Sequence, residues 1–327
     1  MMGAESKMNI QREKTEFGAL IALFVGALCT GGASVLVRIT ETGPIATAFW
    51  RGCIALPFLA VWALLEPRVN APRLATATMQ GLAANARAIV SSFRDPGFRW
   101  AGAFFAGDLA FWNGSLLLTS VAASTLESSL APLFVTFFAW LLWRERPSAR
   151  FMVATVLAIT GVLLMISPKF GHMGAAFTGD ALGVGTAVFY AGYLLAVARL
   201  RARYGTGTVL FNSTLIYTML LFPLALTQKF LPDTLAGWGA LAGCALAAQL
   251  LGQGLIAYAL AHLRPTFSSL GLLVTTLSAA TSAWLVLGER LAAIQIVGGL
   301  VIVGAIAMAR SARQTSAPAG SAAVAQP

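Results

Sequence analysis

The chain has 327 residues, of which 58% are hydrophobic and only 10% are charged, and its mean hydropathy is +0.78. In soluble domains about a quarter of all residues are charged, so this composition excludes an ordinary soluble domain and is typical of an integral membrane protein. The formal net charge of +10 does not indicate a partner nucleic acid, because the basic residues gather at the ends of apolar segments. There they set the orientation of the segments in the membrane.

Ten apolar stretches are each long enough to cross a bilayer core of about 30 Å, which takes about 20 helical residues. Their near-continuous apolarity is typical of helices and not of alternating β-barrel strands. The sequence therefore predicts an all-α integral membrane protein with ten transmembrane helices. The expected spans are 17–38, 44–65, 99–119, 122–143, 149–167, 179–199, 208–228, 236–262, 265–287 and 291–310.

The segments outside the spans indicate how the chain is oriented. With a cytoplasmic amino terminus, most of the 22 Lys and Arg residues fall on the cytoplasmic side. Residues 1–16 are then a cytoplasmic tail, and residues 311–327, rich in Ala, Ser, Gln and Pro, a disordered cytoplasmic tail. The long cytoplasmic loop 66–98 is expected to contain a basic amphipathic helix on the inner leaflet, with partner docking as the alternative.

The second half of the chain repeats the first. Residues 122–153 align with 266–297 at a constant offset of 144. The identical pairs include Ser124/Ser268, Leu126/Leu270, Leu133/Leu277, Ala139/Ala283, Trp140/Trp284, Leu141/Leu285, Glu145/Glu289, Arg146/Arg290, Ala149/Ala293 and Val153/Val297. An odd number of spans between two copies inverts the second copy. We therefore predict two inverted five-helix repeats, 17–167 and 179–310, with a substrate site between them.

Three ionisable residues are expected at membrane depth, where charge is costly and tends to be functional. Arg51 lies in the second span, Asp108 in the third and Glu127 in the fourth. We predict that Arg51 pairs with Glu127 or Asp108 beside a water-filled cavity. The alternative is a buried ion pair that only fixes helix packing. A carboxylate left over from such a pair is the candidate for proton coupling.

Other polar and aromatic residues complete the predicted substrate site. They are Trp112, one turn from Asp108; Gln249 and Gln253, four residues apart in the eighth span; and Tyr190 and Tyr193 in the sixth. Ordinary helix–helix hydrogen bonding and core packing are the alternatives. Pro57, Pro132 and Pro223 are expected to bend their spans. The fifth and tenth spans are expected to brace the cavity from the periphery.

Enzyme signatures are absent from the sequence. It contains no His-Glu-x-x-His, Gly-x-Ser-x-Gly or Walker A motif, so we expect neither an enzyme nor an ATP-driven pump. No cofactor or metal site is expected. Cys29, Cys53 and Cys244 lie far apart in apolar spans and are interpreted as small packing residues.

The two repeated segments carry a family resemblance. The runs from Ala131 to Arg146 and from Ala283 to Arg290 resemble the paired signatures of the EamA family of the drug/metabolite transporter (DMT) superfamily. The resemblance covers residues 17–311. It implies ten helices in two inverted repeats, a bacterial inner membrane location, and outward transport of small metabolites such as amino acids or amines. The family's frequent basic residue early in the second span matches Arg51.

We thus predict a secondary transporter, acting as an exporter of small organic metabolites by alternating access around a midplane cavity. Its partners would be a small-molecule substrate and the lipid bilayer, with protons as the candidate coupling ion, and it would act as a monomer or weak homodimer. Both termini would be cytoplasmic. The main alternative is a non-transporting membrane receptor or assembly subunit, and a membrane enzyme is a more distant one.

Overall fold

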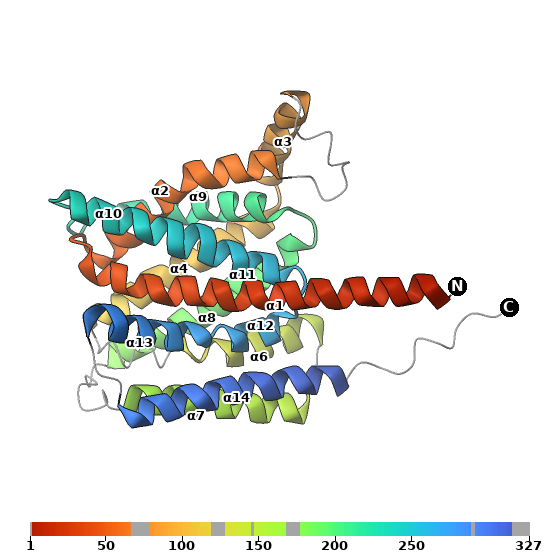
Figure 1. Cartoon of the computed structure of the whole chain (residues 1–327). Coiled ribbons are helices and arrows are strands. Elements are labelled where there is room, and N and C mark those ends of the chain that lie inside the picture. The colour runs from red at the N-terminus through yellow and green to blue at the C-terminus, as the bar shows by residue number, and fades with distance from the viewer. Residues whose placement is uncertain are drawn as a thin grey trace.

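The computed structural model describes residues 2–66, 79–118, 128–144, 147–167, 177–288 and 292–315. Within these ranges every regular element is a helix. The helices lie side by side with their axes roughly along one direction (Figure 1). The amino end of the first helix and the carboxyl end of the last lie at the same end of this bundle (Figure 1).

In the first half of the chain, the helices correspond closely to the predicted spans. These are α1 (Met2–Ile39), α2 (Pro44–Leu65), α3 (Met79–Ser92), α4 (Pro96–Leu118), α6 (Ala131–Trp143) and α7 (Ala149–Ile166). α2 has the predicted bounds, and α1 begins well before its predicted span. α3 is the helix expected within the loop 66–98, and it projects from the end of the bundle where α1 begins (Figure 1).

In the second half, two predicted spans depart from a regular α-helix. The helices are α8 (Phe177–Arg201), α9 (Thr206–Ala225), α10 (Leu235–Cys244), η3 (Ala245–Gly252), α11 (Gln253–Leu260), α12 (Pro265–Gly271), α13 (Val274–Leu287) and α14 (Ala293–Thr315). The eighth span continues through the π-helix η3, and the ninth breaks at residues 272–273. π-Helical turns are rare and are frequently found at functional sites.

Length and composition identify fewer spans than the sequence analysis predicts. Among the described residues, six helical stretches are long and apolar enough to cross a membrane. They are Thr15–Val37, Pro44–Leu65, Ala181–Arg201, Thr206–Ala225, Leu235–Leu260 and Pro265–Val286. Three shorter apolar helices are Ala131–Trp143, Ala149–Leu164 and Ala293–Ala309. The first part of the predicted fourth span, 122–127, lies outside the described residues.

The prolines do not all have the predicted place. Pro57 and Pro223 lie inside α2 and α9. Pro132 was expected inside a span, but it occupies the first turn of α6, which begins at Ala131. The first turn tolerates proline because its backbone N–H groups have no partner within the helix.

Helices of the first half pack in pairs against helices of the second half. α4 packs on α8, and the continuous α10–η3–α11 helix packs on α1. α2 packs on α9, and α7 packs on α14 at the edge of the bundle (Figure 1). Every one of these pairs joins a helix before residue 167 to a helix after residue 177.

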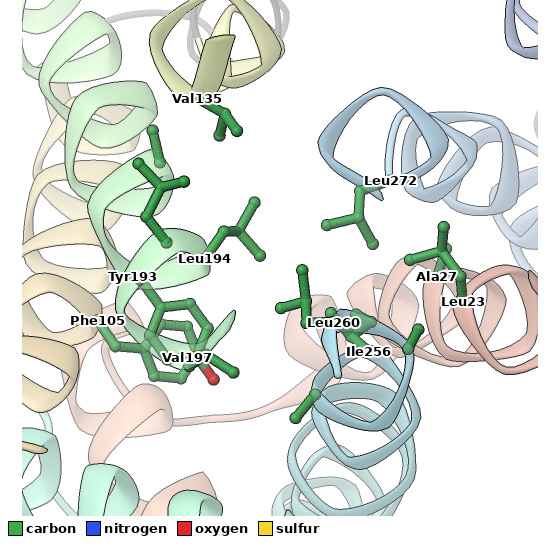
Figure 2. Close-up of a cluster of buried hydrophobic side chains, with 14 of the residues drawn as sticks. Leu23, Ala27, Phe105, Val135, Tyr193, Leu194, Val197, Ile256, Leu260 and Leu272 are labelled. Carbon is green, nitrogen blue, oxygen red and sulfur yellow. The ribbon is translucent and has the colours of Figure 1, made fainter. Parts of the chain in front are cut away.

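Apolar side chains occupy both the centre and the outer surface of the bundle. Buried residues of α1, α4, α6, α8 and α11 converge in the centre, among them Leu23, Val135 and Leu194 (Figure 2). On the outside, Leu285 and Leu300 are each 68% exposed. A surface of this kind is typical of a protein whose outer face contacts lipid.

Candidate functional site

A group of stacked aromatic rings lies between α4, α8 and α9. Phe105 stacks on Tyr193, with ring centroids 4.3 Å apart and an interplanar angle of 14° (Figure 2). Tyr217 meets the edge of Phe105 at 5.0 Å, and Tyr190 stacks on Tyr193 at 6.1 Å. Tyr193 and Tyr217 are almost completely buried. These rings form an apolar wall in which the only polar atoms are hydroxyls.

Arg51 approaches this wall from α2. Its Cζ atom lies 5.7 Å from the centroid of the Phe105 ring, which is within the range of a cation–π contact. Its Nε atom is buried and has no hydrogen-bond partner among the described residues. Its other close neighbour is Tyr217. A guanidinium with a free donor is therefore held against the aromatic wall.

Asp108 lies on α4, three residues after Phe105, and is 9% exposed. The predicted ion pair between Arg51 and Asp108 is not formed, since the described residues show none within 4.0 Å between them. The guanidinium lies over Phe105 and beside Tyr217 instead. The ion pairs found there are at the ends of the bundle, Arg203–Asp95 and Lys229–Asp233. Glu127, the other predicted partner, lies outside the described residues.

The two predicted glutamines lie at the centre of the bundle. Gln253 Oε1 accepts a hydrogen bond of 3.3 Å from the Tyr193 hydroxyl. Gln249 Nε2 donates a hydrogen bond of 2.9 Å to Thr214 Oγ1. Both are buried. Gln249 lies within the π-helical segment η3, and Gln253 is the first residue of α11 directly after it.

Most of the predicted site residues are thus brought together around the aromatic wall. Tyr190 is close to both Asp108 and Gln253. Trp112 is the exception, because its half-buried indole makes no ring contact or side-chain hydrogen bond within the described part of the chain. It lies one turn beyond Asp108 on α4, outside the aromatic wall.

The sequence analysis missed the contribution of α9. Thr214, Tyr217 and Thr218 are all buried, and their i, i+3 and i+4 spacing puts three hydroxyls on one helix face. Phe105 was missed as well, although it anchors the ring stack. A stripe of hydroxyls in an otherwise apolar span is a signal that the sequence does contain.

α2 and α9 cap each other at opposite ends of the bundle. At the Glu66 end, Glu66 accepts hydrogen bonds of 2.7 and 2.8 Å from the backbone N–H groups of Thr206 and Gly207 at the start of α9. At the Gln228 end, Gln228 Oε1 accepts one of 2.9 Å from the backbone N–H of Ile45 at the start of α2. Each cap satisfies backbone donors that the helix itself leaves without a partner.

A second carboxylate strengthens the Gln228 end. Glu41 accepts hydrogen bonds from the backbone N–H groups of Asp233 and Thr234 and from the Thr234 hydroxyl. These bonds, the hydroxyl contribution being the largest, hold the pKa of Glu41 below its ordinary value. Close by, the Trp50 indole donates a hydrogen bond of 2.8 Å to the carbonyl of Phe230.

Neither a metal site nor a redox pair is formed by the described residues. They contain no group of three or more His, Cys, Asp or Glu side chains that could hold a metal ion. Cys29, Cys53 and Cys244 are free thiols. One apolar groove of ≈ 230 Å³ lies between α13 and α14, and a second of ≈ 390 Å³ lies along α3. No predicted site residue lines either groove.

Within the described residues, an all-helical bundle with a lipid-type surface and polar groups at its centre is typical of a multi-pass membrane protein. Residues 17–167, and again residues 177–311, match the EamA-like transporter family. The chain therefore belongs to the EamA-like transporter family, within the DMT superfamily.

The chain resembles known proteins in sequence and in fold. It is 29% identical over 193 residues to the pseudopaline exporter CntI of Pseudomonas aeruginosa, in each of two strains, UCBPP-PA14 and PAO1. The alignment spans 58% of this chain and 66% of that exporter. A solved crystal structure superposes with a TM-score of 0.67 over 94% of this chain and 99% of its own, at 17% identity. That likeness concerns the fold alone.

Proposed function

We propose that the protein is a secondary exporter of small organic metabolites, such as amino acids or amines, which works by alternating access around the central aromatic wall. The observation that carries this proposal is the placement of Arg51 and Asp108. Both ionisable side chains lie at the centre of the bundle without an ion pair between them. Buried charges are costly unless they are paired, so a zwitterionic substrate that pairs with both would relieve that cost.

The proposed architecture is two inverted repeats, 17–167 and 179–310, that enclose this site. The double match to one family and the reciprocal pairing of helices support it. The two caps support it too. The capping residues Glu66 and Gln228 are 162 residues apart in the sequence, and the capped residues Ile45 and Thr206 are 161 apart, so the two caps occupy equivalent positions of the two repeats. A two-fold relation exchanges one cap for the other.

The proposed location is the bacterial inner membrane, with both termini in the cytoplasm. α1 begins and α14 ends at the same end of the bundle, as an even number of spans requires (Figure 1). The Glu66 end is then cytoplasmic. In alternating access, the contacts at the Glu66 end and at the Gln228 end must open in turn.

Asp108 is the proposed proton-coupling group, because it has no hydrogen bond or ion pair among the described residues and lies in the pathway. Glu127 and Trp112 remain proposed substrate-binding residues. A monomer or weak homodimer is the proposed assembly. The similarity to a pseudopaline exporter supports outward transport, while substrate identity rests on the chemistry of the centre.

Counterflow in proteoliposomes tests the proposal. The purified protein is reconstituted with the twenty amino acids and a set of biogenic amines inside the vesicles, and uptake of each labelled compound is followed. Arg51→Gln and Asp108→Asn should each lower exchange about tenfold or more, since a charge-assisted hydrogen bond contributes about 1.5–3 kcal/mol. Arg203→Gln is the matched control, because this side chain is 73% exposed and remote from the centre.

Absence of exchange by the wild type would contradict the proposal, and so would full exchange by both central variants. A protein that binds one of the compounds in detergent but never exchanges it would fit the alternative of a non-transporting receptor or assembly subunit.

A further inference from the structure

We propose that Arg51, Tyr217, Thr218 and Gln249 form an anion pocket that binds the carboxylate of the substrate. The transporter would then select amino acids and other carboxylated metabolites over the corresponding amines. This inference rests on the proposed function and names the substrate class of the same central site.

The pocket is assembled where α2 meets α9. Gly52 packs directly against the hydroxyls of α9: a Cβ atom at this position would lie 2.1 Å from Thr218 Oγ1 and 2.8 Å from Tyr217 Oη. Only a glycine permits this approach. Arg51 directly precedes Gly52, so its side chain starts close to the same two hydroxyls. The polar neighbours of the Tyr217 hydroxyl are Arg51 and Thr218.

Four polar atoms of these residues are buried and have no hydrogen-bond partner within the described residues. They are Arg51 Nε, Tyr217 Oη, Thr218 Oγ1 and Gln249 Oε1. Tyr217, Thr218 and Gln249 are 0%, 4% and 1% exposed, respectively. Buried polar groups in folded proteins are nearly always paired, so four such atoms on adjoining helices indicate a missing partner.

Gln249 is held in position by a contact of its own. Its amide nitrogen donates to Thr214, one helical turn before Thr218, which leaves the amide oxygen as the unpaired atom. The π-helical turn of η3 carries Gln249 to this face of α9. The side chain is therefore fixed, and its amide oxygen remains a free acceptor beside this face of α9.

The donors determine the class of ligand. An arginine N–H and two hydroxyls can donate three hydrogen bonds, and a carboxylate accepts hydrogen bonds without donating any. Arginine favours such oxyanions because its charged N–H groups bond them strongly. In an α-amino acid the ammonium is attached to the carbon next to the carboxylate, which suits the free acceptor of Gln249. Asp108, three residues after Phe105 on α4, is a further acceptor for an ammonium group.

Variants that remove only a hydroxyl test the pocket. Tyr217→Phe and Thr218→Val keep the shape of the side chains, and their matched controls are Tyr258→Phe and Thr160→Val, which lie on exposed helix faces. Counterflow is measured for pairs that differ in one carboxylate, phenylalanine with phenethylamine and lysine with cadaverine. Inorganic phosphate is added as a competing anion.

The wild type should exchange each amino acid with a half-saturation concentration at least about tenfold lower than that of its amine. Each pocket variant should raise that concentration about tenfold for the amino acids and leave the amines unchanged, since the hydroxyl bonds a charged acceptor. Asp108→Asn should weaken exchange of both members of the lysine pair. The control variants should behave as the wild type.

Three results would overturn the assignment while the proposed function stands. They are equal exchange of amino acids and amines by the wild type, equal loss of both in the pocket variants, and stronger competition by phosphate than by any carboxylate. If the wild type exchanges neither class, the proposed function itself fails.

Discussion

At both ends of the bundle α2 and α9 are joined by a helix cap, but the capping side chain is a carboxylate at one end and an amide at the other. At both ends a side chain at the end of α2 or α9 caps the first turn of the other helix, after a glycine at the N-cap position with extended backbone. At the Glu66 end the cap is a carboxylate that accepts two N–H bonds. At the Gln228 end it is an amide that accepts one. The cap of α9 at the Glu66 end is thus made by one charged side chain, whereas the neutral cap at the Gln228 end is accompanied by the contacts of Glu41 and Trp50.

This difference has a consequence for alternating access. A carboxylate at the amino end of a helix gains from charge-assisted hydrogen bonds and from the helix dipole, while a neutral amide gains little from the dipole. The Gln228 end compensates with Glu41 and with the bond from Trp50 to Phe230. Loss of one residue should therefore loosen the Glu66 end more than the Gln228 end.

Glu66→Ala should have the largest effect of the cap variants. It removes both bonds to α9 and should lower the free energy of unfolding by about 1–2 kcal/mol, the range for a helix cap that includes charge. Glu66→Gln keeps one acceptor oxygen and should lose about half of that amount. Thermal unfolding in detergent measures both. Equal stabilities of the wild type and Glu66→Ala would show that this cap contributes nothing.

Gln228→Ala should have a smaller effect, because it removes one neutral hydrogen bond worth about 0.5–1.5 kcal/mol. Gln228→Glu makes the two ends alike and should stabilise the protein by about 0.5 kcal/mol through the dipole of α2. The same unfolding assay orders the variants. A loss in Gln228→Ala as large as that in Glu66→Ala would remove the proposed asymmetry between the ends.

Much of the fold follows from the sequence because apolar length and periodicity are local signals. The bounds of α2 were predicted from its run of apolar residues, and α3 from basic residues interleaved with apolar ones. The π-helix η3 and the break at residues 272–273 were not predicted. Both depend on how the backbone adapts to neighbouring helices, which no pattern within the segment encodes.

The site was predicted in part for the same reason. Charged and amide residues such as Asp108 and Gln253 stand out in an apolar span, so their presence at the centre was expected. The position of Arg51 was not, because its contact with the ring of Phe105 depends on the crossing of α2 and α4. Tyr217 was overlooked because a tyrosine in a membrane span is ambiguous until its neighbours are known.

The smallest predicted effect is a pH dependence of the Gln228 end. Hydrogen bonds hold the pKa of Glu41 below its ordinary value, so its contribution to stability is complete above that ordinary value. The contribution is lost as the pH falls through the lower pKa of the folded protein, where the carboxylate takes up a proton. Thermal unfolding of the wild type and of Glu41→Gln between about pH 3 and pH 7 measures this, with the difference between the two shrinking at low pH. Glu66→Gln provides the comparison at the opposite end. A constant difference between the wild type and Glu41→Gln across this range would mean that the charge of Glu41 does not stabilise the turn before α10, and that the two ends do not differ in the way proposed.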